Sequence, residues 1–317
     1  MAFPKLSSAR VDTQVTNILL AKTNEEKNFL ADQILPPLPN LAQESGKILS
    51  LKNNHLRTYD SKRAVYDESQ HRIEFQYSNN DSYQIDYFDL DIYIPQRIID
   101  QVQDPADARR DAGVTLLNTM MLERDRGLAA LMTSTAIITN NTTLTGTSQY
   151  NDVSGGSRPE VDIETARTSV FNKSGREANA ILLSRKVFNT LKTHPFFLNQ
   201  TRGLSYLGEE VLIELIKDNF GFEHVFVGKT LMITTNEGQT ETIGNMWGND
   251  IVVFYRPNTP SLFEPSFGYT FKLQGKDLRA SNRRHVDDLG DMYRLEMAYQ
   301  QKVLDTNLAY LIKNAVA

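Results

Sequence analysis

The chain has 317 residues, a formal net charge of −5 and 40% hydrophobic residues, so it can form one large or two medium folded domains. It contains no cysteine, which excludes disulfide scaffolds, thiolate nucleophiles and cysteine-ligated zinc sites. The acidic balance argues against a dedicated nucleic-acid reader, because such proteins are usually basic. The first residues carry no apolar signal core, and no long apolar run predicts a membrane span.

The first 45 residues predict an extended arm rather than a compact unit. Asn24 is a candidate cap for a short helix that carries Phe29 and Leu30. Residues 35–39, Leu-Pro-Pro-Leu-Pro, must be extended, because proline lacks an amide donor and restricts the residue before it. The segment therefore offers little that could form a core by itself.

Residues 46–81 predict a long β-hairpin with a charged tip. Apolar residues mark its outgoing and returning strands: Ile48, Leu49, Leu51, Ile73, Phe75 and Tyr77. A lone two-stranded hairpin is marginal in water, so a protrusion of this length needs another surface to lie on. Lys52, Arg57 and Arg63 are therefore candidates for ion pairs with a neighbouring subunit, each contributing about 0–1 kcal/mol.

Residues 83–94 alternate as a strand whose apolar phase changes once. Tyr83, Ile85 and Tyr87 share one face, whereas the alternate residues from Phe88 to Ile94 share the other. One extra residue would restore a single buried face. We therefore predict a β-bulge or a sharp twist near Tyr87.

The clearest helix is predicted at residues 104–134. Asp104 is a good N-cap and Pro105 suits the first helical position. Apolar residues recur at helical spacing along one stripe: Leu116, Leu117, Met120, Met121, Leu128, Leu131 and Met132. At 1.5 Å per residue this helix would be about 45 Å long.

A mixed α/β domain is predicted at residues 160–258, after a polar loop at 139–159. Three helices are expected in it: Asp162–Gly175, Ser184–Pro195 and Ser205–Gly221. Strands are expected at 180–183, 225–227 and 251–255. The remaining residues, 259–317, are predicted to return to the preceding β-rich unit, with strands at 267–273 and 293–299 and an apolar close at 308–312.

A possible phosphate-binding loop at Gly228-Lys229-Thr230 lacks an essential residue. The Walker motif requires a glycine five residues before Gly228, and that position is Glu223. An acidic side chain there would repel phosphate. The pattern favours a strand followed by a turn.

Other catalytic and metal motifs are absent from the sequence. No histidine has a partner at i+4, and no HExxH motif occurs; the five histidines are His55, His71, His194, His224 and His285. Asp86, Asp89 and Asp91 could bind a cation, but their place opposite the apolar stripe favours a solvated strand face. No Gly-x-Ser-x-Gly elbow is present. We therefore expect no catalytic residue, no metal ligand and no cofactor.

A basic run formed by Arg283, Arg284 and His285 precedes two aspartates. One interpretation is a mixed-charge turn. The other is a subunit contact or a weak DNA-facing patch, for which Arg283 and Arg284 are the candidate residues. The sequence leaves both interpretations open.

Segments along nearly the whole chain, from about Phe29 to the C-terminus, resemble one known family. They are Gly46–Asp60, Asp104–Ser134, Ile181–Phe188 with His194-Pro195, His224–Lys229, Trp247–Tyr255, Pro265–Phe271 and Ala309–Val316. In this order they resemble the major capsid protein of tailed double-stranded DNA phages, which has the Hong Kong 97-like shell fold. The resemblance implies an α+β fold with five parts: an N-terminal arm (1–45), an extended loop (46–81), a β-rich peripheral domain with a spine helix (82–159, helix 104–134), an axial α/β domain (160–258) and a return to the peripheral domain (259–317).

The resemblance also implies a function without catalysis. Copies of the chain would assemble into hexamers and pentamers of an icosahedral shell, which encloses double-stranded DNA without reading its sequence. The implied partners are other copies, a portal and a decoration protein. The chain has no long charged helical extension at its N-terminus, which implies either a separate scaffolding protein or a chain that is already mature. The implied location is the virion, after assembly in the host cytoplasm.

Three alternatives stay open from the sequence. An encapsulin-like nanocompartment shell shares the same fold and would carry a cargo-peptide groove. A nucleotide-binding α/β enzyme would need the glycine that Glu223 replaces. A tail or decoration protein is usually β-rich, and the helical patterns at 160–220 argue against it.

Overall fold

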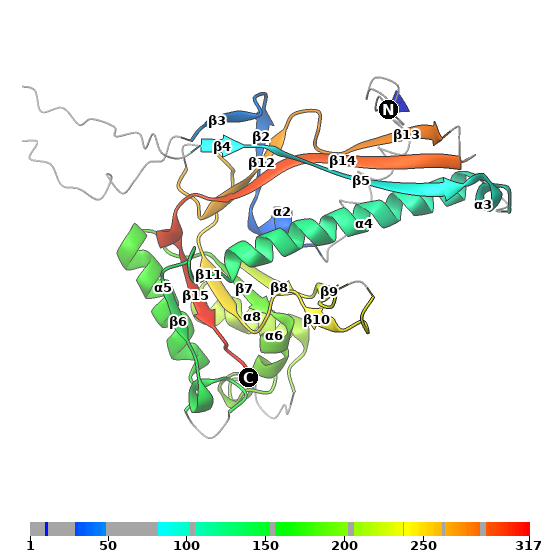
Figure 1. Ribbon diagram of the computed structural model, residues 1–317. Coiled ribbons are helices and arrows are strands. Elements are labelled where there is room, and N and C mark those ends of the chain that lie inside the picture. Colours follow the sequence, from blue (N-terminus) through cyan, green and yellow to red (C-terminus); the bar gives the residue numbers. More distant parts are fainter. Residues whose placement is uncertain are drawn as a thin grey trace, which may run out of the picture.

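The computed structural model describes residues 10–11, 29–48, 82–101, 105–152, 156–201, 206–236, 238–261, 264–285 and 290–317. Within these residues, a six-stranded sheet lies along one long helix, α4 (Pro105–Met132) (Figure 1). A five-stranded sheet with its own helices lies beyond the C-terminal end of α4 (Figure 1). The C-terminus of the chain belongs to the same domain. The structure is thus a mixed helix-and-sheet fold with two sheet layers joined through one helix.

The six-stranded sheet is organised around β14 (Gly290–Val303), which pairs antiparallel with three other strands. Its other strands are β1 (Arg10–Val11), β2 (Pro37–Leu41), β5 (Asp86–Pro95), β12 (Gly268–Leu273) and β13 (Arg279–His285). β13 and β12 pair with successive halves of β14 on one side, and β5 pairs along its other side. The strands predicted at 267–273 and 293–299 are confirmed, and the second is longer than predicted.

The long helix predicted at 104–134 is confirmed as α4, which has 28 residues and is about 42 Å long. Its predicted cap, Asp104, lies outside the described residues. The apolar stripe of α4 packs on the inner face of the large sheet, against Tyr293, Leu295 and Met297 of β14. A short helix, α3 (Gln96–Gln101), precedes it. Among the described helices, none is long and apolar enough to cross a membrane.

A strand break takes the place of the bulge predicted at Tyr87. β4 (Ser82–Gln84) pairs with β3 (Ser45–Lys47), and Ile85, which lies between β4 and β5, donates its backbone N–H to the carbonyl oxygen of Glu44 at 2.8 Å. β5 then pairs with β14 without any register shift. The predicted bulge is therefore wrong: the apolar phase changes because the chain passes from a small sheet to a large one at Ile85.

Part of the predicted N-terminal arm belongs to the core. Leu30, Ala31, Ile34 and Leu35 are buried around a short helix, α2 (Ala31–Ile34). The proline-rich segment is extended as predicted and forms β2, a parallel partner of β12 at the end of the strand order, where a strand tolerates proline. The prediction of an arm outside the core is thus wrong for residues 30–41.

The second sheet has the strand order β6-β15-β11-β7-β8. Its strands are β6 (Asn141–Thr143), β7 (Ala180–Ser184), β8 (His224–Gly228), β11 (Ile251–Phe254) and β15 (Ala309–Lys313). One face packs against α5 (Pro159–Ser174), α6 (Arg185–Leu191) and α8 (Glu209–Phe220). The opposite face packs against the end of α4 and the buried N-terminal segment. Because both faces are covered, β7 and β11 are apolar almost throughout.

Two helices of this domain, α5 and α8, end where predicted but begin at other residues. Gly175 and Gly221 follow α5 and α8 with φ angles of 68° and 66°, a left-handed conformation that suits glycine. α5 begins at Pro159 rather than at the predicted Asp162, because proline fits the first helical position. α6 begins as predicted, with Ser184 accepting from Val187 N–H. α8 begins at Glu209 rather than at Ser205.

Three further predictions in this region are wrong. The segment 259–317 does not return as a whole to the large sheet, since β15 pairs antiparallel with β11 of the α/β domain. The predicted loop 139–159 contains β6, which pairs in parallel with β15. Residues 195–198, expected only to end a helix, start a new short one, α7 (Pro195–Leu198). The α/β domain therefore draws strands from both sides of residues 160–258.

Candidate functional site

The candidate contact residues on the extended loop cannot be placed. Lys52, Arg57 and Arg63 lie outside the described residues, so their contacts with a neighbouring subunit stay a prediction. The base of the loop is described: β3 and β4 pair antiparallel, with Lys47 opposite Ser82. The two ends of this segment are therefore neighbours in the small β3–β4 sheet.

Arg283 and Arg284 lie on a strand and not in the turn that one interpretation predicted. They belong to β13, where they pair with Met292 and Asp291 of β14. Both side chains are exposed. The interpretation as a mixed-charge turn is wrong, and a role in a subunit contact or a DNA-facing patch stays a prediction.

An arginine pairs with two of the three aspartates of the acidic cluster on β5. Arg294 of β14 donates from Nε and Nη2 to the two carboxylate oxygens of Asp91, both at 2.7 Å, and its Nη1 lies 3.7 Å from Asp89. The hydrogen bond to Asp91 raises the pKa of Arg294 above its ordinary value. Among the described residues no group of three or more His, Cys, Asp or Glu side chains could hold a metal ion.

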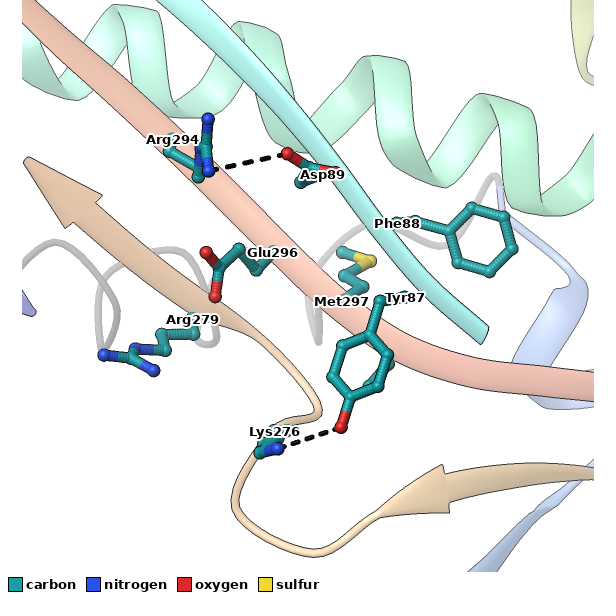
Figure 2. Close-up of a pocket in the computed structure, with 9 residues that line it drawn as sticks. Tyr87, Phe88, Asp89, Lys276, Arg279, Arg294, Glu296 and Met297 are labelled. Carbon is teal, nitrogen blue, oxygen red and sulfur yellow. Dashed lines mark hydrogen bonds and ion pairs between the residues drawn. The ribbon is translucent and has the colours of Figure 1, made fainter. Parts of the chain in front are cut away.

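A cavity of about 330 Å³ lies beside this ion pair on the outer face of the sheet, and Figure 2 shows its lining. The Tyr87 hydroxyl accepts from Lys276 Nζ at 2.9 Å and donates to Glu44. Arg279 and Glu296 occupy paired positions on β13 and β14. The charged groups that line the cavity thus largely face groups of opposite sign. The lining offers no nucleophile paired with a base.

A buried serine–histidine pair has the wrong hydrogen bonds for catalysis. Ser157 Oγ lies 3.0 Å from His194 Nε2. The backbone N–H of Phe196 donates to His194 Nδ1 at 3.2 Å, so the proton of the neutral ring is on Nε2. Burial lowers the pKa of His194 and favours this neutral ring. A general base must accept the serine proton, whereas this histidine donates to Ser157 and caps α7.

Gly228-Lys229-Thr230 forms the strand end and turn that the sequence favours. Lys229 Nζ pairs with Glu209 at 2.8 Å, and the Thr230 hydroxyl donates to Asp125 at 3.3 Å. The indole of Trp247 lies so close to Gly228 that a Cβ there would be 2.4 Å from Trp247 Cδ1. The glycine is needed for this packing, and its surroundings are not those of a phosphate loop.

Replacing Gly228 with alanine should therefore lower the free energy of unfolding by about 1–3 kcal/mol, because Trp247 or the strand must shift. Urea unfolding of the unassembled chain measures this change. Gly127→Ala inside α4 is the matched control: its Cβ would meet only the flexible end of Gln301, and the free energy of unfolding should rise by about 0.5–1 kcal/mol. Equal effects of the two substitutions would contradict the packing argument.

A buried polar junction around Asp125 was not predicted from the sequence. Asp125 of α4 is fully buried and accepts the backbone N–H groups of Leu30 at 3.2 Å and Ala31 at 2.9 Å. It also accepts the hydroxyl of Thr230. Burial raises its pKa to about 6, although these hydrogen bonds act in the opposite direction. One carboxylate thus joins α4, the N-terminal segment and the α/β domain.

The neighbouring residue, Arg124, extends the junction to the large sheet. Its side chain is 3% exposed and donates to both carboxylate oxygens of Asp32 on α2. Its guanidinium carbon lies 4.9 Å from the ring centroid of Tyr299 on β14. Lys272 of β12 also reaches Asp32 at 3.1 Å. Burial acts to raise the pKa of Asp32, but the charges of Arg124 and Lys272 hold it below its ordinary value.

One signal could have revealed this junction. Arg124 and Asp125 lie at helical spacing between Met121 and Leu128, on the stripe that the sequence marks as apolar. Charged residues are almost never fully buried unless they are paired. A charge on an apolar stripe therefore predicts a buried partner, although not which one.

Comparison with known proteins identifies the fold. No protein-family model matches the chain. Over 316 residues it is 23% identical to the major capsid protein of Pseudomonas phage JBD67, covering 97% of each chain. Its structure matches a phage-related protein from Bordetella bronchiseptica RB50 with a TM-score of 0.76 and 23% identity, covering 97% of this chain and 98% of that one. It also matches the capsid of cyanophage P-SCSP1u with a TM-score of 0.55 and 13% identity, covering 88% and 86%.

The chain has a phage capsid fold. The same capsid fold occurs in the encapsulin complex of Synechococcus elongatus PCC 7942, which matches with a TM-score of 0.52 and 12% identity and covers 99% of this chain and 96% of that one. The structures therefore show the fold that a phage shell and an encapsulin share. The sequence match over nearly the full length is to a phage capsid protein.

Within this capsid fold, the buried junction lies where the two sheet regions meet. The C-terminal part of α4, to which Arg124 and Asp125 belong, lies between the large sheet and the α/β domain (Figure 1). Their partners come from segments far apart in the sequence, namely Leu30 to Asp32, Thr230 and Lys272. The junction is structural: it fixes how the parts of the capsid fold are held together.

Proposed function

We propose that this chain is the major capsid protein of a phage, a shell subunit that assembles with copies of itself and catalyses no reaction. The observation that carries the proposal is the similarity to a phage major capsid protein over 97% of the chain, together with the capsid fold. The described residues support a structural role, because the serine–histidine pair, the charged cavity and the Gly-Lys turn are each explained by packing and pairing.

The parts of the fold receive the following roles in the proposal. The helix α4 is the spine, and the six-stranded sheet with β3 and β4 forms the peripheral domain. The α/β domain is the axial domain, which surrounds the centres of hexamers and pentamers and includes β6 and β15 as well as residues 160–258. The loop between β3 and β4 is the extended loop, which lies on an adjacent subunit.

The proposed partners are the other components of a tailed-phage head. They are further copies of the chain, a separate scaffolding protein, a portal and a decoration protein, with the virion as the site of action and the host cytoplasm as the site of assembly. The formal charge of −5 supports a shell wall that encloses double-stranded DNA without binding it tightly, since phosphate contacts need many basic residues. For the same reason no sequence-specific DNA binding is proposed.

Electron microscopy of the purified chain tests the proposal directly. We expect closed shells or capsomers by negative stain, and megadalton species by light scattering. A compact monomer under every assembly condition would refute the proposed function. An encapsulin-like compartment, which the Synechococcus match favours as the second candidate, would contain protein cargo rather than DNA when isolated from its native source.

Deleting residues 53–70 should abolish particle formation, because the extended loop would lose the part that lies on a neighbouring subunit. The measurement is particle yield by light scattering and microscopy. Thermal unfolding of the unassembled variant is the control, and it should match the parent chain because β3 and β4 remain paired. Particles of unchanged yield and stability would show that the loop does not hold neighbouring subunits.

A further inference from the structure

Residues 30–41, which we call the strap, depend on other elements for their structure. α2 has only four residues, whereas an isolated helix needs about 12–15 to be marginally stable in water. Its N-cap residue, Leu30, makes no side-chain cap. β2 contains Pro37 and Pro39, which cannot donate to a ladder, and it pairs only with β12 among the described strands. The strap therefore keeps its shape only while neighbouring elements hold it.

The strap contacts both the large sheet and the α/β domain. Figure 1 shows it in blue, running between α2, beside the C-terminal end of α4, and β2 in the large sheet. Four buried residues of the strap share a core cluster with that end of α4 and with strands of the α/β domain; they are Leu30, Ala31, Ile34 and Leu35. The β2 half of the strap packs instead with residues of β12. One short segment thus joins the two sheet regions.

Asp125 of α4 supplies the cap that α2 lacks. It accepts the backbone N–H groups of Leu30 and Ala31, which belong to the unpaired donors at the start of a helix. Arg124, the preceding residue of α4, donates to the carboxylate of Asp32 in the same turn. Both contacts act at one end of the strap. Asp125 is therefore a latch, because the first turn of α2 would have buried donors without a partner if its bonds were lost.

Both sheet regions have a core that does not include the strap. The large sheet and α4 share one cluster, in which Leu117 and Leu295 are buried. The sheet and helices of the α/β domain share another, in which Ile163 and Phe188 are buried. No residue of the strap belongs to the buried set of either cluster. Release of the strap therefore leaves each region with a core of its own.

We propose that the strap is a releasable clamp between the two sheet regions: it opens as one unit while both regions stay folded, and ionisation of the Asp125 latch promotes the opening. It opens as a unit because α2 cannot persist once it leaves α4. With the clamp open, the contact between the two regions loses four buried apolar side chains, so their relative orientation can change. The clamp does not rest on the proposed capsid function, and the unassembled chain is sufficient to test it.

The charge of Asp125 gives the clamp its control. Asp125 is fully buried while the strap is closed, and burial raises its pKa to about 6. The charged groups around it are Arg124 on α4, Asp32 on α2 and Lys272 on β12, whereas Lys229, next to its partner Thr230, pairs with Glu209. An open strap exposes the carboxylate to water, where its pKa returns toward 3.8. The closed clamp is therefore favoured at low pH, and opening becomes easier as the pH rises through about 6.

Thiol labelling tests the opening, since the sequence has no cysteine and gives no background. Ala31→Cys in the strap and Ala166→Cys in α5 each place one thiol at a position that is 0% exposed. At low urea concentration we expect Ala31→Cys to react about tenfold faster or more, because only the strap opens. Adding Ile216→Val in the core of the α/β domain should speed labelling of Ala166→Cys by about 2- to 10-fold and leave Ala31→Cys unchanged. Equal rates at both positions, or acceleration of both by Ile216→Val, would overturn the proposal.

Hydrogen exchange of the parent chain measures the same opening without a substitution. The backbone N–H groups of Gln33, Ile34 and Leu35 donate to carbonyl oxygens of Leu30 and Ala31. After correction for intrinsic rates, we expect these groups to exchange about tenfold faster or more than those of β7 in the middle of the second sheet. Equal protection of α2 and β7 would show that the strap opens only when the whole chain unfolds, and the clamp would be wrong.

The pH dependence of this exchange tests the latch. Between pH 5 and pH 8 the corrected exchange of the α2 groups should accelerate roughly tenfold. Asp125→Asn has nearly the same shape and does not titrate, so the acceleration should disappear. Asp250→Asn is the matched control: burial raises the pKa of Asp250 too, but its contacts with Lys313 and Asn314 lie within the α/β domain, so the acceleration should remain. Acceleration that persists in Asp125→Asn, or is absent from the parent chain, would refute control of the clamp by Asp125.

Discussion

Replacing Asp32 with alanine should lower the free energy of unfolding by about 3–5 kcal/mol, because the buried charge of Arg124 would lose its partner. The Arg124 side chain is 3% exposed, and its Nε already has no hydrogen-bond partner. The lower end of the range is expected, since Asp32 is 33% exposed and water can enter in its place. Urea unfolding of the unassembled chain gives the value.

Asp277→Ala is the matched control for this substitution. Asp277 is the second partner of Lys272, but its side chain is 50% exposed, and Lys272 keeps its contact with Asp32. An exposed ion pair contributes about 0–1 kcal/mol, so the control should change stability little. Similar losses from Asp32→Ala and Asp277→Ala would contradict the importance of burial.

A double substitution separates the charge from the packing. Adding Arg124→Met to Asp32→Ala removes the charge that the single substitution leaves unpaired. Replacing a buried pair by apolar groups is often nearly neutral, so the double variant should be more stable than Asp32→Ala alone. Part of the loss should remain, because methionine cannot reproduce the contact of the guanidinium with the Tyr299 ring. If the double variant is less stable than Asp32→Ala, the unpaired charge of Arg124 is not the cause of the lost stability.

Local patterns predicted the elements whose signals are complete within themselves. The apolar stripe of α4 extends over many turns, and Ser184, Gly175 and Gly221 mark helix ends through the conformations of single residues. These signals depend on spacing and backbone chemistry, which the sequence displays directly. The order of the longer helices and the buried strands from 160 to 258, namely α5, β7, α6, α8, β8 and β11, could therefore be predicted.

Elements that depend on distant partners could not be predicted. β6 consists of Asn141, Thr142 and Thr143, which carry no apolar alternation, and it is a strand because β15 offers an edge beside it. In the sequence, the segment around Leu30 looks like an extended arm. In the fold it is buried, because the end of α4 and Trp247 pack in the same core cluster. Apolar phase alone could not show whether the change after Ile85 is a bulge or a passage between two sheets.

The candidate contact residues show the same division. Basic residues on a charged loop or run are visible in the sequence, but whether Arg283 and Arg284 lie in a turn or a strand depends on their pairing with β14. The exposed face of β9 (Leu231–Ile233) and β10 (Ile243–Asn245) was not predicted, because their aliphatic residues look like core residues until burial is known. The sequence therefore shows which residues are apolar, and only the fold shows which of them face outward.

Raising the pH from 3.8 to about 6 should lower the free energy of unfolding by roughly 2 kcal/mol through Asp125 alone. Burial raises the pKa of Asp125 from 3.8 to about 6, so over this range the folded chain holds a proton that the unfolded chain has released. The contribution is fully present below pH 3.8 and is lost as the pH rises through about 6. Well above that pH, Asp125 is ionised in both the folded and the unfolded chain, so it adds no further pH dependence to the free energy of unfolding.

Asp125→Asn isolates this contribution, because asparagine has nearly the same shape and does not titrate. The side-chain oxygen of the asparagine can still accept from Ala31, although the bonds from Leu30 and Thr230 must rearrange. The variant should therefore differ from the parent chain in its free energy of unfolding, but this free energy should no longer fall between pH 3.8 and about 6. Burial also raises the pKa of Asp162, so Asp162→Asn is the control that should keep the Asp125 slope. The charged neighbours Arg124, Asp32 and Lys272 are the same in both variants. Identical pH slopes in the parent chain and Asp125→Asn would show that the buried carboxylate does not take up a proton on folding.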